Sequence, residues 1–145
     1  MRKSITLGMA WMLTLSTSLA SASGIAGAAF QGNNLVYIQG AASNTSTNYD
    51  NWAFATLPSG AWDQTPTVKI HVYNNGQTLT CTLRTRNIDT GSLSTNTTST
   101  TISGQITLNL SLSLTYGPKY SHAAFCLLPK QLGIASATIF AASIT

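Results

Sequence analysis

The side chains suited to acid–base chemistry are few and scattered. Asp50, Asp63 and Asp89 are the only acids of the chain, and each has a turn-like context (YDNW, WDQT, IDTG). Asp is common in turns because its carboxylate accepts local backbone N–H bonds. His71 and His122 are isolated in the sequence, and we interpret both as surface residues. The sequence therefore predicts no catalytic constellation, and we expect a protein that is not an enzyme.

Other patterns for catalysis or metal binding are also missing. No Gly-x-Ser-x-Gly elbow occurs among the many serines. Asp89-Thr90-Gly91 matches the tripeptide of aspartic proteases but occurs once, whereas those enzymes share a proton between two carboxylates. The two cysteines have no His or Cys at zinc spacing, and calcium needs clustered acids. We expect neither a metal nor a cofactor.

Two groups of side chains remain as candidate ligand-binding residues. The first is a basic stripe on the outward face of a predicted hairpin, and it consists of Lys69, His71, Tyr73, Arg84 and Arg86. It is either an ordinary solvated sheet face, which we favour, or a contact surface for an anionic partner such as an acidic glycan. The second group is Tyr49, Trp52 and Trp62. Exposed aromatics can stack on sugar rings, but large aromatics dominate small cores, so we favour burial.

The hairpin spans Thr67 to Arg86. Asn75-Gly76 favours a two-residue type I′ turn, because both central positions of that turn need positive φ. The six residues of the three expected facing pairs then fall on one face, and this agreement of both strands over-determines the register. The expected facing pairs are Val72 with Leu79, Ile70 with Cys81, and Val68 with Leu83.

Other segments also favour strands over helices. Regular alternation predicts an antiparallel strand at Gln105–Leu114, and Ala123–Leu128 is apolar on both faces, as in a central strand. Shorter or weaker strands are expected at 34–39, 52–55 and 134–144, a loop at 41–51, and an exposed loop or weak edge strand at 92–103. About seven strands and no helix predict an all-β fold: a small antiparallel β-sandwich, immunoglobulin-like or jelly-roll-like.

Cys81 and Cys126 are expected to form one disulfide that cross-links the core. Closing a loop of about 45 residues stabilises the fold by roughly 4 kcal/mol in the chain-entropy model. The bond either links the two sheets or joins neighbouring parts of one sheet, and the sequence leaves both open.

The N-terminus has the pattern of a secretory signal peptide. A basic start (Met1-Arg2-Lys3-Ser4) precedes an apolar stretch at 5–15 and the small-x-small sequence Ala20-Ser21-Ala22. The stretch is shorter than the roughly 20 residues of a membrane-spanning helix. We expect residues 1–22 to be cleaved after Ala22 (or, as second choice, after Ala20) and residues 23–145 to form one secreted domain, extracellular or periplasmic, with 23–33 flexible.

Removal of Arg2 and Lys3 leaves five Lys and Arg residues against three Asp. This excess is too small for a nucleic-acid binder that neutralises phosphates. We expect a secreted, non-enzymatic protein that binds a glycan or another surface protein and has no membrane span. The alternatives are a carbohydrate-binding module that uses exposed aromatics, or a structural subunit of a fimbria or surface layer. Sequons at Asn44, Asn96 and Asn109 matter only in a host that glycosylates exported proteins.

Overall fold

The computed structural model describes residues 23–57, 67–111 and 120–144. The expected signal peptide (1–22) and Trp62 lie outside this part of the chain. Where the chain is described, no helix is long and apolar enough to cross a membrane.

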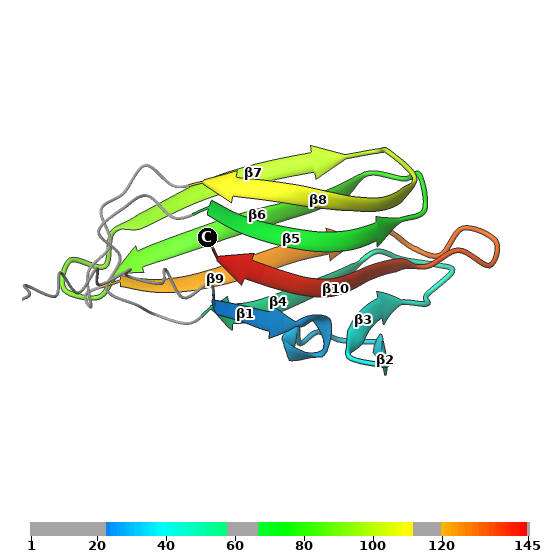
Figure 1. Cartoon of the computed structure of the whole chain (residues 1–145), viewed down its shortest axis with the longest axis horizontal. Coiled ribbons are helices and arrows are strands. Elements are labelled where there is room, and N and C mark those ends of the chain that lie inside the picture. Colours follow the sequence, from blue (N-terminus) through cyan, green and yellow to red (C-terminus); the bar gives the residue numbers. More distant parts are fainter. Residues whose placement is uncertain (1–22, 58–66, 112–119, 145) are drawn as a thin grey trace, which may run out of the picture.

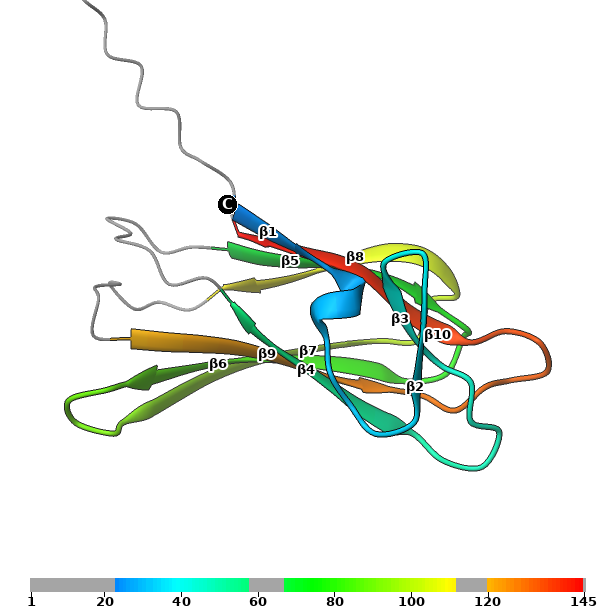
Figure 2. The same cartoon turned by 90° about the horizontal axis from the view of Figure 1, so that it is seen from below.

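The protein is an antiparallel β-sandwich, as predicted, and its described residues form ten strands where about seven were expected. Figure 2 shows its two layers edge-on. The six-stranded sheet has the order β2-β3-β10-β5-β8, with β1 also paired to β10, and the four-stranded sheet has the order β4-β9-β6-β7. The six-stranded sheet consists of β1 (Ser23–Ala26), β2 (Leu35–Ile38), β3 (Ala41–Asn44), β5 (Thr67–Asn74), β8 (Gly104–Ser111) and β10 (Ala137–Ile144). The four-stranded sheet consists of β4 (Asn51–Leu57), β6 (Leu79–Asn87), β7 (Leu93–Thr100) and β9 (Tyr120–Leu128).

Side chains point alternately to the two faces of each strand, and those that point inward form the core between the two sheets. Every second residue of β5, β6 and β9 is buried, and the apolar ones form one cluster. The inward positions predicted for the hairpin strands are confirmed: Val68, Ile70, Val72, Leu79, Cys81 and Leu83 are all buried. The strand predicted at 105–114 is confirmed over 105–111, and residues 112–114 lie outside the described part of the chain. The central position of 123–128 in its sheet is confirmed as well.

The prediction that the two hairpin strands, β5 and β6, pair with each other is wrong. β5 pairs with β10 and β8, whereas β6 pairs with β9 and β7, so the chain changes sheet between Asn74 and Leu79. A type I′ turn does not form because Asn75 is not at positive φ; among the described non-glycine residues only Asn34 and Gln39 are. The Asn75 amide instead donates to the carbonyls of Lys130 (2.8 Å) and Ala135 (3.3 Å) in the β9–β10 loop.

The N-terminal segment, for which a flexible lead-in was expected at 23–33, packs against the body of the domain. β1 pairs with the end of β10, and the 3₁₀ turn η1 (Gly27–Ala29) follows it. Phe30 is then fully buried, so its apolar ring anchors the segment. Residues 41–44 were likewise expected in a loop but form β3, whose inward Ala42 belongs to the core.

The hydroxyl-rich segment 92–103 forms an edge strand, the second of the two predicted alternatives. β7 pairs with β6 on one side, and β8 of the other sheet follows it through a short loop. Side chains of β7 bind backbone carbonyls of β8: Asn96 Nδ2 donates to Ser111, and Thr98 Oγ1 donates to Asn109 at 3.3 Å. These bonds close this side of the sandwich (Figure 1).

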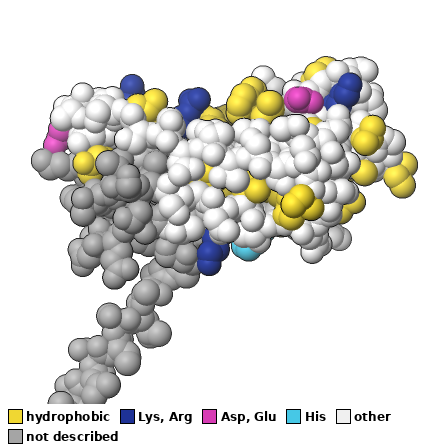
Figure 3. Space-filling view, turned by 90° about the horizontal axis from the view of Figure 1, so that it is seen from above, with side chains coloured by type: hydrophobic (Ala, Val, Ile, Leu, Met, Phe, Trp, Pro, Cys, Tyr) yellow, Lys and Arg dark blue, Asp and Glu magenta, His cyan; other side chains and the backbone are white. Residues whose placement is uncertain are grey.

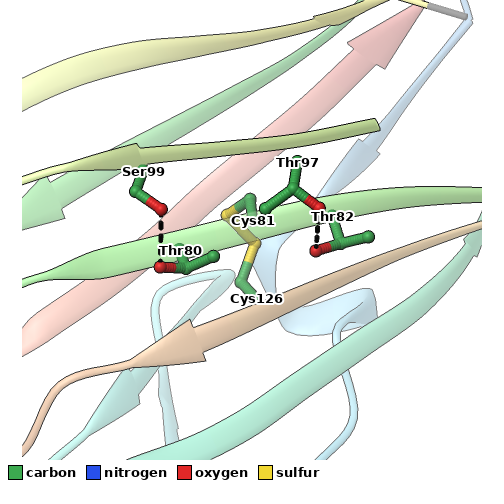
Figure 4. Close-up of a disulfide and its surroundings, with 6 residues drawn as sticks. All are labelled: Thr80, Cys81, Thr82, Thr97, Ser99 and Cys126. Carbon is green, nitrogen blue, oxygen red and sulfur yellow. Dashed lines mark hydrogen bonds between the residues drawn. A yellow bond between two sulfur atoms is a disulfide. The ribbon is translucent and has the colours of Figure 1, made fainter. Parts of the chain in front are cut away.

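The disulfide joins neighbouring strands of one sheet. Cys81 of β6 and Cys126 of β9 are directly opposite in register, with Cα atoms 4.1 Å apart (Figure 4). Both side chains are fully buried, so the bond lies in the core and not on the surface. The short Cα distance is typical of a non-hydrogen-bonded antiparallel pair.

Candidate functional site

The outer face of the four-stranded sheet carries an exposed apolar patch. In register, Trp52 of β4 lies beside Leu127 of β9, and Phe54 lies beside Phe125. Trp52 is 54% exposed and Phe54 43%, while Phe125 and Leu127 are half-buried. We call these four side chains the platform.

The alternation of β4 explains why its aromatic residues face the solvent. Asn51, Ala53, Ala55 and Leu57 are the inward, buried positions, and the small alanines allow the sheets to pack closely. The bulky residues between them therefore point outward. Our preference for burial was wrong for Trp52 and also for Tyr49, which is 51% exposed in the loop before β4.

Two contacts stabilise the platform: one between two of its rings, and one between a ring and an arginine. The Phe54 and Phe125 rings are stacked, with centroids 6.2 Å apart and planes 25° from parallel. The Arg84 guanidinium of β6 lies 4.4 Å from the centroid of the Phe125 ring. A cation over an aromatic face is held by the quadrupole of the ring, so this contact fixes both groups.

A strip of hydroxyl groups continues the platform across the sheet. Thr80 is opposite Leu127 and Thr82 is opposite Phe125, and both pair on their other side with β7. Thr80 Oγ1 and Ser99 Oγ lie 2.8 Å apart, and Thr82 Oγ1 and Thr97 Oγ1 lie 2.9 Å apart (Figure 4). Each pair consumes one O–H in its internal bond, so the second O–H of the pair is available to a ligand.

The predicted basic stripe is divided between the two sides of the molecule. Arg84 and Arg86 lie on the outer face of the four-stranded sheet, where the platform lies, whereas Lys69, His71 and Tyr73 lie on the outer face of the six-stranded sheet. Figure 3 shows Lys and Arg side chains along two opposite margins of the molecule. On the six-stranded side, His71 Nδ1 is 2.9 Å from Thr107 Oγ1.

His122 is buried, which corrects its assignment to the surface. It is an inward residue of β9, and its Nδ1 lies 2.9 Å from Thr85 Oγ1 of β6. Burial lowers the pKa of this imidazole, because desolvation disfavours the charged form. Among the described residues, His, Cys, Asp and Glu form no group of three or more that could hold a metal ion.

Asp50 and Asp89 both belong to loop structure, as predicted. Asp89 lies in the turn after β6, where Asn87 Oδ1 accepts bonds from the backbone N–H groups of Asp89 and Thr90. Asp50 Oδ1 accepts a bond of 2.9 Å from the backbone N–H of Lys130. Neither carboxylate is on a strand of the candidate site.

Neither a protein-family model nor a curated protein matches the sequence. Solved structures do match in fold. The C-terminal CBM6 of the laminarinase LamC from Zobellia galactanivorans aligns with a TM-score of 0.53 and 11% identity, over 86% of this chain and 98% of that one. The xylan-binding module CBM86 of Roseburia intestinalis aligns with a TM-score of 0.53 and 16% identity, over 86% of this chain and 94% of that one.

The fold is a jelly-roll-like β-sandwich. An exo-β-1,3-galactanase of Phanerochaete chrysosporium aligns with a TM-score of 0.54 and 12% identity over 88% of this chain, which spans only 30% of the galactanase chain. At such identities the likeness concerns the fold alone. The residues of the site have to be argued from this chain itself.

Sequence reasoning singled out Trp52, Arg84 and Arg86 on this face but missed the other residues of the site. Phe54 lies two residues after Trp52, and the alternation of large and small residues at 52–55 was a signal that both aromatics share one face. Phe125 and Leu127 gave no such signal, because a segment apolar at every position does not reveal which side is exposed.

Proposed function

We propose that this protein is a non-enzymatic domain that binds a polysaccharide across the outer face of its four-stranded sheet. The observation that carries the proposal is the platform: four apolar side chains, two of them large exposed aromatics, beside two hydrogen-bonded pairs of hydroxyl groups. Exposed contiguous apolar surface on a small domain commonly marks a binding site.

The chemistry of this sheet face is complementary to both the faces and the edges of a sugar ring. A pyranose ring presents C–H groups on its faces, which pack on aromatic rings, and hydroxyl groups on its edges, which exchange hydrogen bonds. The exposed side chains of Trp52 and Phe54 offer the first kind of contact, and Phe125 supports Phe54 from the neighbouring strand. Thr80, Thr82 and their partners offer the second.

The open shape of the sheet favours an extended chain over a single sugar. Trp52 and Phe54 are two residues apart on one strand, hence about 6.8 Å apart along it. A ligand lying along β4 and β9 contacts both apolar rows at once, and its edge lies above β6.

Two further observations support the proposal. The solved structures that align over almost their whole length, CBM6 and CBM86, are named as carbohydrate-binding modules, and the second is called a xylan-binding module. The disulfide and the signal-like segment 1–22 fit an exported protein, because disulfides persist in oxidising compartments. Export places the domain where polysaccharides are found.

The test is affinity electrophoresis of the folded protein against a panel of neutral and acidic polysaccharides, followed by calorimetric titration with the best ligand. Trp52→Ala and Phe54→Ala are expected to weaken binding tenfold or more, as central aromatics often do. Phe140→Ala is the matched control, since Phe140 is 40% exposed but belongs to β10 of the other sheet. Equal losses in all three variants, or none in the first two, would refute the proposed site.

A further inference from the structure

Two arginines extend the candidate site along β6. Thr82, Arg84 and Arg86 follow one another on the outer face, each about 6.8 Å beyond the last. Both guanidinium groups are exposed, and neither forms an ion pair with a residue that the structure describes. A ligand running along the sheet from Trp52 therefore passes the platform first and then two unneutralised positive charges.

We infer that the polysaccharide bound on this face is anionic, with its carboxylate or sulfate ester groups held by Arg84 and Arg86. This inference rests on the proposed function and adds the chemical class of the ligand. Carboxylate and sulfate share the feature that matters here: two or more oxygens that accept the paired N–H groups of a guanidinium.

The contact with Phe125 makes Arg84 suited to this task. The ring lies 4.4 Å from the guanidinium carbon and is itself stacked on Phe54. It restricts the long side chain without neutralising its charge or consuming its N–H donors. An arginine held in this way loses less conformational freedom when an anion binds, and its planar fork is presented beside the apolar rows.

The local charge supports an anion and not a cation. No acidic residue occurs on the described strands of the four-stranded sheet. Asp50 precedes β4 at the Trp52 end, away from the arginines, and its carboxylate accepts a bond from the Lys130 backbone. Asp89 is the described acid on the arginine side, because it lies in the turn after β6, three residues beyond Arg86 and outside the sheet.

The other basic group is a weaker candidate. Lys69 lies in register with Asn109 and Ser143, and His71 lies in register with Thr107 and Ala141, so neither has an aromatic residue beside it in its row. Lys69 nevertheless provides a matched control, because Lys69→Gln removes the same unit of charge from the opposite face.

The experiment compares each acidic polysaccharide with its neutralised form. The probes are polygalacturonate against its methyl ester, and a sulfated galactan against the desulfated polymer. Dissociation constants are measured by calorimetry at low and at moderate NaCl concentration. The wild-type protein is expected to bind at least one acidic polymer about tenfold or more tightly than its neutral counterpart, with affinity falling as salt rises.

The variants locate the charge contact. Arg84→Gln and Arg86→Gln should each weaken binding of the acidic polymer several-fold or more, with Arg84→Gln the larger, and leave the neutral polymer unchanged. Arg84→Lys should recover only part of the loss, because an ammonium lacks the planar fork. Lys69→Gln should have no effect. Arg86→Gln keeps the test valid if Arg84→Gln disturbs Phe125, since Arg86 makes no such contact.

The outcomes separate this inference from the proposed function. Equal binding of acidic and neutral polymers, lost in Trp52→Ala but not in Arg84→Gln, overturns the anionic class and leaves the polysaccharide site intact. Acidic binding that survives Trp52→Ala and falls in Lys69→Gln overturns both, because it places the contact on the other sheet. Selective binding of the uronate or of the sulfated polymer supports the inference and identifies the anionic group.

Discussion

Gln31 and Phe54 exchange two backbone hydrogen bonds, of 2.7 and 2.8 Å. Phe54 lies on β4, an edge strand, whose other neighbour is β9. The N-terminal segment therefore forms backbone hydrogen bonds with Phe54, the residue of β4 whose ring stacks on Phe125. An edge strand with free backbone groups invites pairing with other chains, and this bridge occupies part of that edge beside the platform.

The close packing of η1 against β10 leads to a first prediction. A Cβ added at Gly27 would lie 1.9 Å from the carbonyl oxygen of Ile139 in β10. Gly27→Ala should therefore lower the free energy of unfolding by about 1–3 kcal/mol, as overpacking does. Urea denaturation measures this, with Gly24→Ala as the control, since its Cβ would come no closer than 3.4 Å to a neighbouring atom. Equal stability of the two variants would show that η1 does not pack closely against β10.

The buried disulfide gives a second prediction. Cys81→Ala with Cys126→Ala should destabilise the protein by about 4 kcal/mol, the entropy of a loop of 45 residues. For a domain of this size, Tm should fall by about 10 °C or more. Reduction of the wild-type protein should give a similar shift in a thermal melt, and the double variant should not respond to reductant. An unchanged wild-type Tm after verified reduction would contradict the assigned role.

The buried histidine gives a third prediction. The pKa of His122 is below 6.5 in the fold and returns to about 6.5 on unfolding. Below pH 6.5 the unfolded chain takes up this proton before the folded chain does, so the free energy of unfolding should fall as the pH drops towards the folded pKa.

His122→Gln keeps an amide that can donate to the Thr85 hydroxyl or accept from it, and should remove this contribution to the pH dependence. Urea titrations between pH 7.5 and 5 measure it, and His71→Gln on the exposed face of the six-stranded sheet is the control. If wild-type and His122→Gln proteins lose stability in parallel, His122 does not carry the effect.

Asn44 gives a fourth prediction, because its buried amide joins two loops. Its Nδ2 donates to the carbonyls of Leu128 (3.0 Å) and Pro129 (3.1 Å), and its Oδ1 accepts from Asn51 Nδ2 at 2.7 Å. Asn44→Ala should cost about 2–3 kcal/mol by leaving buried polar groups without partners. Asn109→Ala, on an exposed outward position of β8, should cost less than about 0.5 kcal/mol in the same denaturation assay. A small loss at Asn44 would mean that water replaces its bonds.

Alternation of apolar and polar residues in the sequence predicts well which face of a strand is buried, but it does not predict which strands pair. It placed Ile70 and Cys81 inward, and both are buried. It did not reveal that their strands belong to different sheets, because a strand of either sheet has the same inward pattern. Asn75-Gly76 pointed to a local turn, but the Asn75 amide binds a loop more than fifty residues away in sequence, and local propensity does not include such contacts.

The candidate site depends on the same long-range pairing. Arg84 and Phe125 meet because β6 and β9 are neighbours, and Phe125 meets Phe54 because β9 and β4 are neighbours. Neither pairing has a short-range signal. The expected stripe of five residues was divided for the same reason, since Lys69 and Arg84 come from strands of opposite sheets.

Ser23 lies directly opposite Ile144, where β1 and β10 run side by side (Figure 1). A pulling force applied through these two residues acts on the rungs of this pair one after another and peels β1 away, instead of shearing every rung at once. The Cys81–Cys126 bond lies in the other sheet and bears no load at the start of this process. We therefore expect the domain to yield at low force when it is stretched between these two residues, even though the cross-link is expected to raise its thermal stability.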